Sequence, residues 1–547
     1  MAATAGACAG VIYEPATTTG DQNVIHRSAY QDVDIPEVPL WKVVMERFAG
    51  FGNRPALVDG PSGRTLSYVQ LLRDVERAAK GLAAAGLRKD DVLAICAPNL
   101  PEYAVALLAV NRLGGVVTTM NPLYTAEEIG RQIAETRARF LLTVPSLSER
   151  CLEACRGSSV QQVLCLGEAA GVLAFEQLYS DHGRLPHVHV SPRTHVAAMP
   201  YSSGTSGVPK GVMLTDYNLV AQLMQAHVML ERTRDDVVLA VLPFFHIYGL
   251  MLILFDGLRH GSTLICMPRF DFVQFLECVQ AYRVSVAPLV PPIVLGLAKH
   301  PAVDQYDLSS LERIMCGAAP LGAEVERACA QRLGCRIMQG YGMTEFAGAS
   351  LTHRASATTS KIGSVGRCWP NMQARIVNLE TGGNLGVGEA GELLMRGPNV
   401  MKGYFERPDA TQEILVDGWL RTGDIAYVDE DGDFFIVDRV KELIKHNAWQ
   451  IAPAELEAVL LRHPAIADAA VIPSPDEESG EVPKAFVVLK APVETAAILA
   501  FVAEHVAPYK KIRRIAVVDA IPKSPSGKIL RRVLVEQERA AMARPAA

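Results

Sequence analysis

The chain has 547 residues, of which 49% are hydrophobic and 20% are charged. These proportions are those of an ordinary globular protein, and the length exceeds what one hydrophobic core organises, so we expect two or more domains. The net charge of −6 argues against non-specific nucleic-acid binding, which needs a basic surface. A charged substrate would therefore be held by local cations.

The cysteines and the apolar segments indicate in which cellular compartment the protein is expected. Eleven cysteines are scattered along the chain, and no two of them have Cys-x-x-Cys spacing. This predicts free thiols in a reducing compartment and no zinc site. The chain has no apolar stretch of about 20 residues, and its first residues lack the pattern of a secretory signal. We expect a cytoplasmic protein without membrane insertion and a disordered leader at 1–22.

Strands and helices alternate from about residue 55. Short apolar runs predict strands, at 55–58, 91–96, 116–119, 140–144 and 212–215. Amphipathic patterns predict helices at 68–85, before Gly86, and at 103–113, before Gly114. Thr125 and Glu128 form a capping box that begins another helix. This alternation predicts an α/β fold with largely parallel strands.

The pattern changes towards the C-terminus. From 363 to 437, turn signals recur every few residues between short β-rich segments at 374–377, 392–395 and 434–437. A compact α+β pattern follows, with helices at 453–463 and 495–506 and strands at 469–473 and 484–489. We expect an N-terminal domain at 23–437 that includes a β-rich subdomain at about 363–437, a hinge at 438–442 and a small C-terminal domain at 443–547.

Residues 201–212 read Tyr-Ser-Ser-Gly-Thr-Ser-Gly-Val-Pro-Lys-Gly-Val. Glycines let backbone N–H groups approach phosphate oxygens, the hydroxyls add donors and Lys210 adds a positive charge. The segment suits a nucleotide triphosphate, and the alternative is a Ser/Gly surface loop. A Walker-type P-loop does not fit, because Lys210 follows Pro209 and leads into a predicted strand rather than a helix.

Two further segments carry side chains suited to nucleotide chemistry. His246 lies among aromatic residues at 244–249, where it is either a packed core histidine or part of a site. In the segment 339–345, Tyr341 can stack on a base and Glu345 can bind Mg²⁺ through oxygen. The alternative for this segment is a tight turn with a helix-capping threonine.

Three charged segments follow. Asp424 ends the string Trp-Leu-Arg-Thr-Gly-Asp, where its carboxylate either holds ribose hydroxyls or closes an Asx turn. The string Asp-Arg-Val-Lys at 438–441 is a charged strand exit that is more often solvated than functional. Lys528 follows a Pro/Ser/Gly loop, and the alternative there is a solvated turn. Tyr404, in a turn after Gly403, receives no role.

Together these segments resemble the adenylate-forming (ANL) superfamily of acyl-CoA synthetases, non-ribosomal adenylation domains and luciferases. The resemblance runs from about residue 40 to 535 and is greatest to the 4-coumarate–CoA ligase branch. It is carried by Ser-Ser-Gly-Thr-Ser-Gly-Val-Pro-Lys-Gly-Val, Leu-Pro-Phe-Phe-His-Ile-Tyr-Gly, Gly-Ala-Ala-Pro-Leu-Gly at 317–322, Gln-Gly-Tyr-Gly-Met-Thr-Glu and Val-Asp-Arg-Val-Lys-Glu-Leu-Ile-Lys. Matches of this number in one order leave little room for chance.

The resemblance implies an AMP-forming ligase that uses ATP, Mg²⁺ and coenzyme A in two half-reactions. A carboxylate attacks the α-phosphate of ATP to give an acyl-adenylate and pyrophosphate, and the CoA thiol then displaces AMP. The first step brings an anion to a polyanion, so its barrier is largely electrostatic. In this superfamily the small C-terminal domain is mobile, and it rotates between the two steps about a hinge that here is Lys441.

The resemblance also assigns roles to individual residues. Lys528 reaches both the carboxylate and the α-phosphate, and an ordinary lysine pKa near 10.4 keeps it charged at neutral pH. His246 borders the carboxylate and the CoA tunnel rather than acting as a base. The remaining assignments are Ser202, Ser203, Gly204, Thr205, Ser206, Gly207 and Lys210 to the phosphates, Gly317, Gly340, Tyr341 and Gly342 to adenine, Thr344 to the α-phosphate, Glu345 to magnesium, Asp424 and Arg439 to ribose, and Lys445 and Gln450 to the CoA step.

Two positions depart from the superfamily pattern. Ala448 stands where the relatives usually have a glycine beside the pantetheine channel, and its methyl group disfavours a positive φ. Ser206 replaces the usual threonine but keeps the hydroxyl. Ala448 favours one rival, an adenylating enzyme that transfers the acyl group to an amine or oxygen, as amide synthetases and luciferases do. Lys445 and Gln450 match the relatives and keep CoA ligation as the first expectation.

The acyl pocket is expected to involve Tyr248, Gly317, Ala318, Gly342 and Gly348. Small residues leave room for a flat ring, and a tyrosine can stack or hydrogen-bond. We expect a phenylpropanoid-type aryl acid such as a hydroxycinnamate, with medium-chain fatty acids second. Partners are the carboxylic acid, ATP and CoA, with no nucleic acid, and the chain is expected to act as a monomer or homodimer. A non-catalytic nucleotide sensor is disfavoured, because it would need neither Lys528 nor Glu345.

Overall fold

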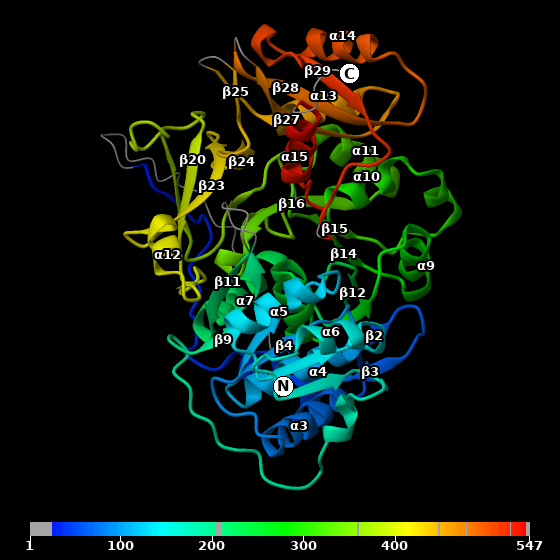
Figure 1. Ribbon diagram of the computed structural model, residues 1–547, viewed down its shortest axis with the longest axis vertical. Helices are drawn as coiled ribbons and strands as arrows, with labels where there is room; N and C mark the ends of the chain where they lie inside the picture. Colours follow the sequence, from blue (N-terminus) through cyan, green and yellow to red (C-terminus); the bar gives the residue numbers. More distant parts are fainter. Residues whose placement is uncertain are drawn as a thin grey trace, which may run out of the picture.

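The computed structural model describes residues 24–202, 209–357, 360–446, 449–476, 479–525 and 527–542. The leader expected at 1–22 lies outside these residues. Figure 1 shows a larger α/β body that contains the blue, cyan and green segments, a yellow β-rich part beside it, and an orange and red α+β part at one end. The mixed α/β character that the sequence predicts is confirmed.

The first sheet of the α/β body, within the described residues, follows the order β10-β11-β9-β5-β4-β6-β7-β8, with β21 beside β11. Its strands are β4 (Val92–Ile95), β5 (Val116–Thr119), β6 (Phe140–Thr143), β7 (Gln162–Cys165), β8 (Leu173–Ala174), β9 (Val196–Ala198), β10 (Tyr201–Ser202), β11 (Lys210–Thr215) and β21 (Gly403–Tyr404). The strands from β9 to β8 are parallel, whereas β10 and β11 are antiparallel.

The second sheet follows the order β18-β17-β16-β15-β14-β12-β13-β2-β3 in the described part of the chain. Its strands are β2 (Pro55–Asp59), β3 (Thr65–Ser67), β12 (Val237–Ala240), β13 (Thr263–Cys266), β14 (Val286–Leu289), β15 (Arg313–Cys316), β16 (Arg336–Met343), β17 (Gly348–Thr352) and β18 (Arg367–Cys368). The central strands are parallel, which agrees with the predicted alternation of strands and helices.

The helices of this body begin and end close to the local signals in the sequence. Thr125 and Glu128 form the predicted capping box, and Gly86 and Gly114 adopt positive φ of 99° and 68° just after their helices. The α-helices are α1 (Leu40–Met45), α2 (Phe48–Phe51), α3 (Tyr68–Ala84), α4 (Pro101–Arg112), α5 (Ala126–Thr136), α6 (Ser148–Ala154), α7 (Asp216–Leu230), α8 (Asp256–His260), α9 (Phe272–Tyr282), α10 (Pro291–Lys299) and α11 (Ala323–Leu333).

Short 3₁₀ turns connect these elements, and one π-helix interrupts the pattern. The 3₁₀ turns are η1 (Pro145–Leu147), η2 (Phe175–Leu178), η4 (Pro301–Gln305), η5 (Thr344–Phe346) and, near the C-terminus, η6 (Pro508–Lys510). The π-helix η3 (Tyr248–Phe255) follows the His246 segment. π-Helical turns are rare and are found frequently at functional sites.

The β-rich part is an antiparallel sheet and has two features that the sequence pattern did not indicate. Its strands are β1 (His26–Arg27), β19 (Gln373–Val377), β20 (Gly391–Arg396), β22 (Leu415–Val416), β23 (Trp419–Val428) and β24 (Phe434–Arg439). β1 pairs with β19, so a segment near the N-terminus forms one edge of this sheet. A helix, α12 (Pro408–Ile414), interrupts the strands where only turns were expected.

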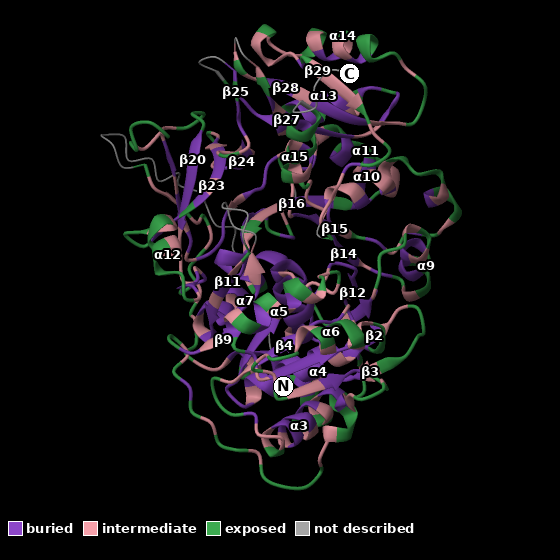
Figure 2. Ribbon diagram, viewed as in Figure 1, coloured by how far each residue is buried: buried purple, intermediate pink, exposed green. Residues whose placement is uncertain are grey.

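The C-terminal part is a separate α+β unit. Its strands are β25 (Ile444–His446), β26 (Trp449–Ile451), β27 (Ile466–Asp476), β28 (Gly480–Leu489) and β29 (Arg514–Val517), and its helices are α13 (Pro453–Arg462), α14 (Thr495–His505) and α15 (Arg531–Met542). Its buried apolar residues form clusters distinct from the large cluster of the α/β body. Figure 2 shows buried segments along the sheets and exposed ones at the periphery. None of the described helices is long and apolar enough to cross a bilayer.

Candidate active site

The segment predicted to bind phosphate begins and ends in an antiparallel pair of strands. Ser202 on β10 pairs with Lys210 on β11, and these two antiparallel strands form a hairpin. Ser203, Gly204, Thr205, Ser206 and Gly207 lie outside the described residues. Their expected roles therefore stay predictions, whereas Ser202 and Lys210 are placed side by side. The strand predicted to follow the loop is confirmed as β11.

Glu345 is a buried carboxylate that faces this hairpin. It lies on η5 and is 2% exposed. Ser202 Oγ donates to Glu345 Oε1 at 2.7 Å, and Tyr404 Oη donates to the same oxygen at 2.8 Å. Lys210 Nζ lies 5.1 Å from the centre of the Tyr404 ring. The carboxylate expected to bind magnesium thus lies directly beside the β10–β11 hairpin.

Tyr404 is a site residue that the sequence reasoning missed. It lies on β21, which pairs with β11 so that Tyr404 opposes Val212. This pairing joins residues that are far apart in the chain, and no local pattern around Tyr404 indicates it. Burial first, and the charge of Glu345 second, raise the Tyr404 pKa well above its ordinary value. Tyr404 is therefore a hydrogen-bond donor rather than a phenolate near neutral pH.

A second carboxylate, Asp424, lies on β23 with 4% exposure. Tyr341 Oη donates to Asp424 Oδ2 at 2.6 Å, and Arg439 Nε lies 3.2 Å from Asp424 Oδ1. Asp424 and Arg439 are direct partners between β23 and β24, so strand register places this ion pair. Burial raises the Asp424 pKa, while Arg439 and Tyr341 oppose that shift. The structure thus unites the residues expected at adenine and ribose.

Tyr341 reaches Asp424 because β16 changes partners along its length. Up to Gln339 the strand is parallel to β15, and from Gly340 it pairs antiparallel with β17, with a bulge between Tyr341 and Gly342. Bulges of this kind redirect side chains next to active sites. Thr344, expected at the α-phosphate, follows directly after β16 and is buried.

Lys528 comes from the C-terminal part yet lies in the field of these groups. Its pKa is lowered from the ordinary 10.5, first by burial and then by the positive charge of Arg439. The carboxylates of Asp424 and Glu345 oppose that shift. The expectation of an ordinary lysine pKa is therefore wrong, because the side chain loses solvent where the two parts of the chain meet.

A tight turn holds Lys528 against the α/β body. Lys528 N donates to Ser524 Oγ at 3.1 Å, and Gly527 N donates to Ser524 O at 2.8 Å. Gly527 has a φ of 78°, and a Cβ on it would lie only 3.0 Å from Val290 Cγ2, just before α10. Gly527 thus allows both the left-handed backbone and the close approach that carries Lys528 into the site.

His246 precedes η3 and shares this environment. Its pKa is lowered to about 3, first by burial and then by the charge of Lys528. The imidazole is therefore neutral at physiological pH, and so low a pKa makes it a weak base. This agrees with the expectation that His246 borders the carboxylate rather than acting as a base.

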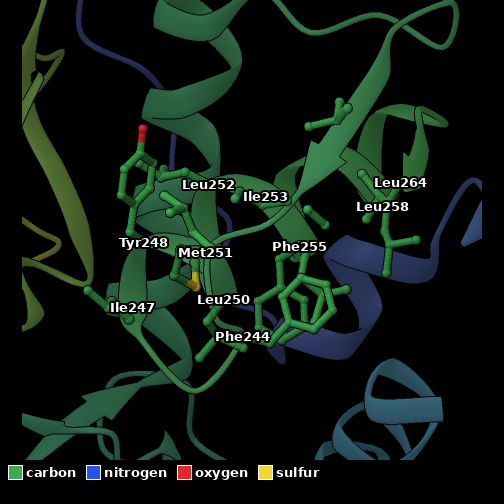
Figure 3. Packing of buried hydrophobic residues seen from close by; sticks show 14 of the residues in the cluster. Phe244, Ile247, Tyr248, Leu250, Met251, Leu252, Ile253, Phe255, Leu258 and Leu264 are labelled. Carbon is green, nitrogen blue, oxygen red and sulfur yellow. The ribbon is translucent and has the colours of Figure 1, made fainter. Parts of the chain in front are cut away.

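The expected acyl-pocket residues gather between η3, β15, β16 and β17. Tyr248 Oη donates to Met315 O at 2.8 Å, and a Cβ on Gly317 would lie 3.2 Å from Tyr248 Cε1. Figure 3 shows Tyr248 at one side of the apolar cluster around η3, with its hydroxyl directed away from Met251 and Leu250. Ala318 follows Gly317 directly and has a φ of 71°. The tyrosine ring is thus held in place as a fixed wall.

Gly342 and Gly348 form the opposite side of this region. A Cβ on Gly342 would lie 2.0 Å from Gly348 O, so the backbones of β16 and β17 approach too closely for any side chain there. Gly348 has a φ of 140°, which L-residues rarely adopt. Both glycines are therefore required by the backbone, Gly342 by the close approach of the two strands and Gly348 by its φ.

Lys445 and Gln450 are placed together but away from the other groups. They are direct partners in the β25–β26 hairpin, and both are exposed. Among the described residues, no hydrogen bond or ion pair joins either side chain to Asp424 or Lys528. Figure 1 shows β25 well away from β16, on which Tyr341 lies. Ala448, between them, lies outside the described residues.

A large α/β part and a small α+β part that meet over two buried carboxylates and a lysine have the architecture of the adenylate-forming class. The chain belongs to the family of AMP-binding enzymes, since residues 44–405 match the AMP-binding enzyme family and residues 455–528 match its C-terminal domain. The resemblance stated from the motifs is therefore confirmed.

Relatives with assigned names support the same class. The chain is 43% identical to 4-coumarate–CoA ligase from Pinus taeda over 93% of this chain and 97% of the relative. It is 41% identical to 4-coumarate–CoA ligase from Vanilla planifolia over 94% of this chain and 96% of that one.

Solved structures with the same fold include enzymes of more than one acceptor type. An anthranilate CoA ligase in complex with anthranoyl-AMP superposes with a TM-score of 0.86 at 25% identity, covering 93% of this chain and 98% of that one. The amide bond synthetase McbA from Marinactinospora thermotolerans superposes with a TM-score of 0.81 at 28% identity, covering 91% and 99%. Fold alone therefore does not distinguish CoA from an amine as the acceptor.

Proposed function

We propose that this chain is an ATP-dependent carboxylic acid–CoA ligase that activates an aryl acid of the hydroxycinnamate type. The acid becomes an acyl-adenylate with release of pyrophosphate, and the CoA thiol then takes the acyl group with release of AMP. The named relatives at 41–43% identity, which are 4-coumarate–CoA ligases over nearly their whole length, support the reaction class.

The observation that carries the proposal is the position of Lys528. It reaches from the C-terminal part into the field of Asp424, Glu345 and Arg439. A cation there lowers the repulsion between the attacking carboxylate and the α-phosphate, which is the main electrostatic barrier of adenylation. We infer that the arrangement in this structure is the one that performs the first half-reaction.

In that half-reaction a carboxylate oxygen forms a bond to the α-phosphorus while the bond from that phosphorus to the bridging oxygen breaks. The electron pair leaves with pyrophosphate. Asp424 and Arg439 would orient the ribose, Tyr341 would flank adenine, and Thr344 would donate to the α-phosphate. Ser202 and Lys210 would hold the outgoing phosphates at the hairpin.

The residues around Glu345 suit magnesium. A buried carboxylate with two hydroxyl groups at 2.7 and 2.8 Å offers the oxygen ligands that this ion prefers. When bound, Mg²⁺ neutralises charge on the phosphates of ATP. Glu345 would hold the ion, while Ser202 and Tyr404 would fix the carboxylate.

The CoA step would need a different arrangement of the two parts. Lys445 and Gln450 lie on an exposed hairpin in this structure. Rotation about Lys441, in the turn between β24 and β25, would bring them to the adenylate and carry Lys528 away. The expected domain boundaries and a monomeric or homodimeric state stay predictions.

One assay tests the class and the substrate together. Wild-type protein should exchange radiolabelled pyrophosphate into ATP when a hydroxycinnamate is supplied, and more weakly with medium-chain fatty acids. The same reactions with CoA should yield acyl-CoA by mass, whereas supplied amines should yield little amide. If none of the aryl acids supports exchange, the proposed substrate class is refuted. If amide forms but acyl-CoA does not, the proposal that CoA is the acceptor is refuted.

A further inference from the structure

Gln222 on α7 carries a buried hydrogen-bond donor without a partner. Its side chain is 0% exposed, and among the residues that the structure describes its Nε2 has no hydrogen-bond acceptor. Buried polar groups are almost always paired, so each exception needs an explanation. Either a ligand supplies the missing acceptor or the group is a structural defect.

The orientation of this amide is fixed by its neighbour. Asn399 Nδ2 donates to Gln222 Oε1 at 2.9 Å and to Phe346 O at 2.9 Å. Because the Asn399 nitrogen must donate to both, the Gln222 oxygen faces Asn399 and its nitrogen faces the other way. The free donor is therefore a consequence of the network and not of an arbitrary choice of rotamer.

The donor faces the wall of the expected acyl pocket. A Cβ on Gly348 would lie 3.2 Å from Gln222 Nε2, so Nε2 lies beside the space left by the missing side chain. Ser350, two residues along β17 at its bulge against β16, has a fully buried Oγ that also has no partner among the described residues. Of these two unpaired groups, Gln222 Nε2 is the one that lies beside Gly348.

Neighbouring elements close this region from the other sides. The π-helix η3, which begins with Tyr248, packs against both α7 and β17. Most side chains of η3 are apolar and buried (Figure 3). A flat ring between Tyr248 and Gly348 would therefore meet apolar surface along its length and a hydrogen-bond donor at one position only.

We propose that Gln222 determines specificity by donating a hydrogen bond from Nε2 to a ring oxygen of the acid, either a hydroxyl or a methoxy group, at the end distant from the carboxylate. This inference rests on the proposed function and assigns one of its recognition contacts. An acid without such an oxygen leaves the amide unpaired, which is how a polar site rejects an apolar analogue.

The test compares 4-hydroxycinnamic acid with cinnamic acid in pyrophosphate exchange. Gln222→Met keeps the length of the side chain. In this variant, kcat/KM for 4-hydroxycinnamic acid divided by kcat/KM for cinnamic acid should fall about tenfold. Gln225→Met is the matched control, because Gln225 is equally buried on α7 but its Nε2 already donates to Pro370 O at 2.7 Å. The control should keep the wild-type ratio.

An equal loss for both acids, or the same change of ratio in Gln225→Met, would overturn the role of Gln222. A substrate series on the wild type tests the same contact if Gln222→Met does not fold. There, 4-methylcinnamic acid, which matches the hydroxyl in size but accepts no hydrogen bond, should be about tenfold poorer than the 4-hydroxy acid. Equal use of the two would overturn the inference alone, whereas wild-type failure with every aryl acid would overturn the proposed function as well.

Discussion

Replacing Gly527 by alanine should slow adenylation while leaving thioester formation from preformed acyl-adenylate nearly intact. Gly527 has a φ of 78°, and a Cβ there would lie 3.0 Å from Val290 Cγ2 and 3.1 Å from Val290 Cβ. The left-handed backbone at position 527 strains alanine in both arrangements of the C-terminal part, docked or rotated away. The contact with Val290, by contrast, acts only while the Lys528 turn is docked on the α/β body.

The magnitude follows from these two terms. A left-handed backbone costs alanine about 1–2 kcal/mol in both arrangements. Crowding a buried valine costs about 1–3 kcal/mol and falls on the docked arrangement alone. Each 1.4 kcal/mol corresponds to about a tenfold change in population. We therefore expect adenylation to slow by about tenfold or more, together with a modest loss of overall stability.

Pyrophosphate exchange measures the first step, and single-turnover release of AMP from synthetic acyl-adenylate with CoA measures the second. Val290→Ala in the Gly527→Ala background should restore part of the exchange rate, because it removes the Cγ2 methyl group that the new Cβ would meet. Equal losses in both steps, or no recovery in the double variant, would refute the reasoning that docking of this turn limits adenylation.

Three further predictions follow from the charged groups. Because the Lys528 pKa lies below its ordinary 10.5 and the charged form is the active one, exchange should decline with rising pH before 10.5, and the residual activity of Lys528→Arg should lack that decline. Because His246 has a pKa of about 3, His246→Gln should keep the shape of the pH–rate profile above about pH 5. If one arm of that profile disappears in the variant, His246 transfers a proton in the reaction. Tyr404→Phe removes one donor to Glu345 and should raise the KM for ATP about tenfold, unlike Tyr427→Phe, whose ring stacks on Phe435.

The sequence predicted local structure well where one or two residues decide it. The Thr125–Glu128 capping box and the glycines after α3 and α4 fix helix ends through backbone chemistry that operates within a few positions. It failed at α12 and β1. The helix α12 is a single short element among turn signals, and β1 is a two-residue strand whose partner, β19, lies far away in the chain.

The candidate site shows the same division. Motif order alone identified Glu345, Asp424, Arg439 and Lys528 as a set, because each chemical task in nucleotide activation needs a particular side chain. It did not indicate Tyr404, whose hydroxyl reaches Glu345 only because β21 adds to the edge of β11. Nor did it indicate Gln222, since nothing near it in the chain shows that its amide is buried and unpaired.

By itself, then, the sequence determined the α/β character through its periodicity, and through the resemblance of its short motifs it gave the class of reaction and the charged residues proposed to carry it, because such patterns act locally. Only the tertiary structure decided which of these groups meet. The lowered pKa values of Lys528 and His246 arise where the C-terminal turn covers the α/β body and removes solvent, and burial of that kind depends on contacts between residues far apart in the chain.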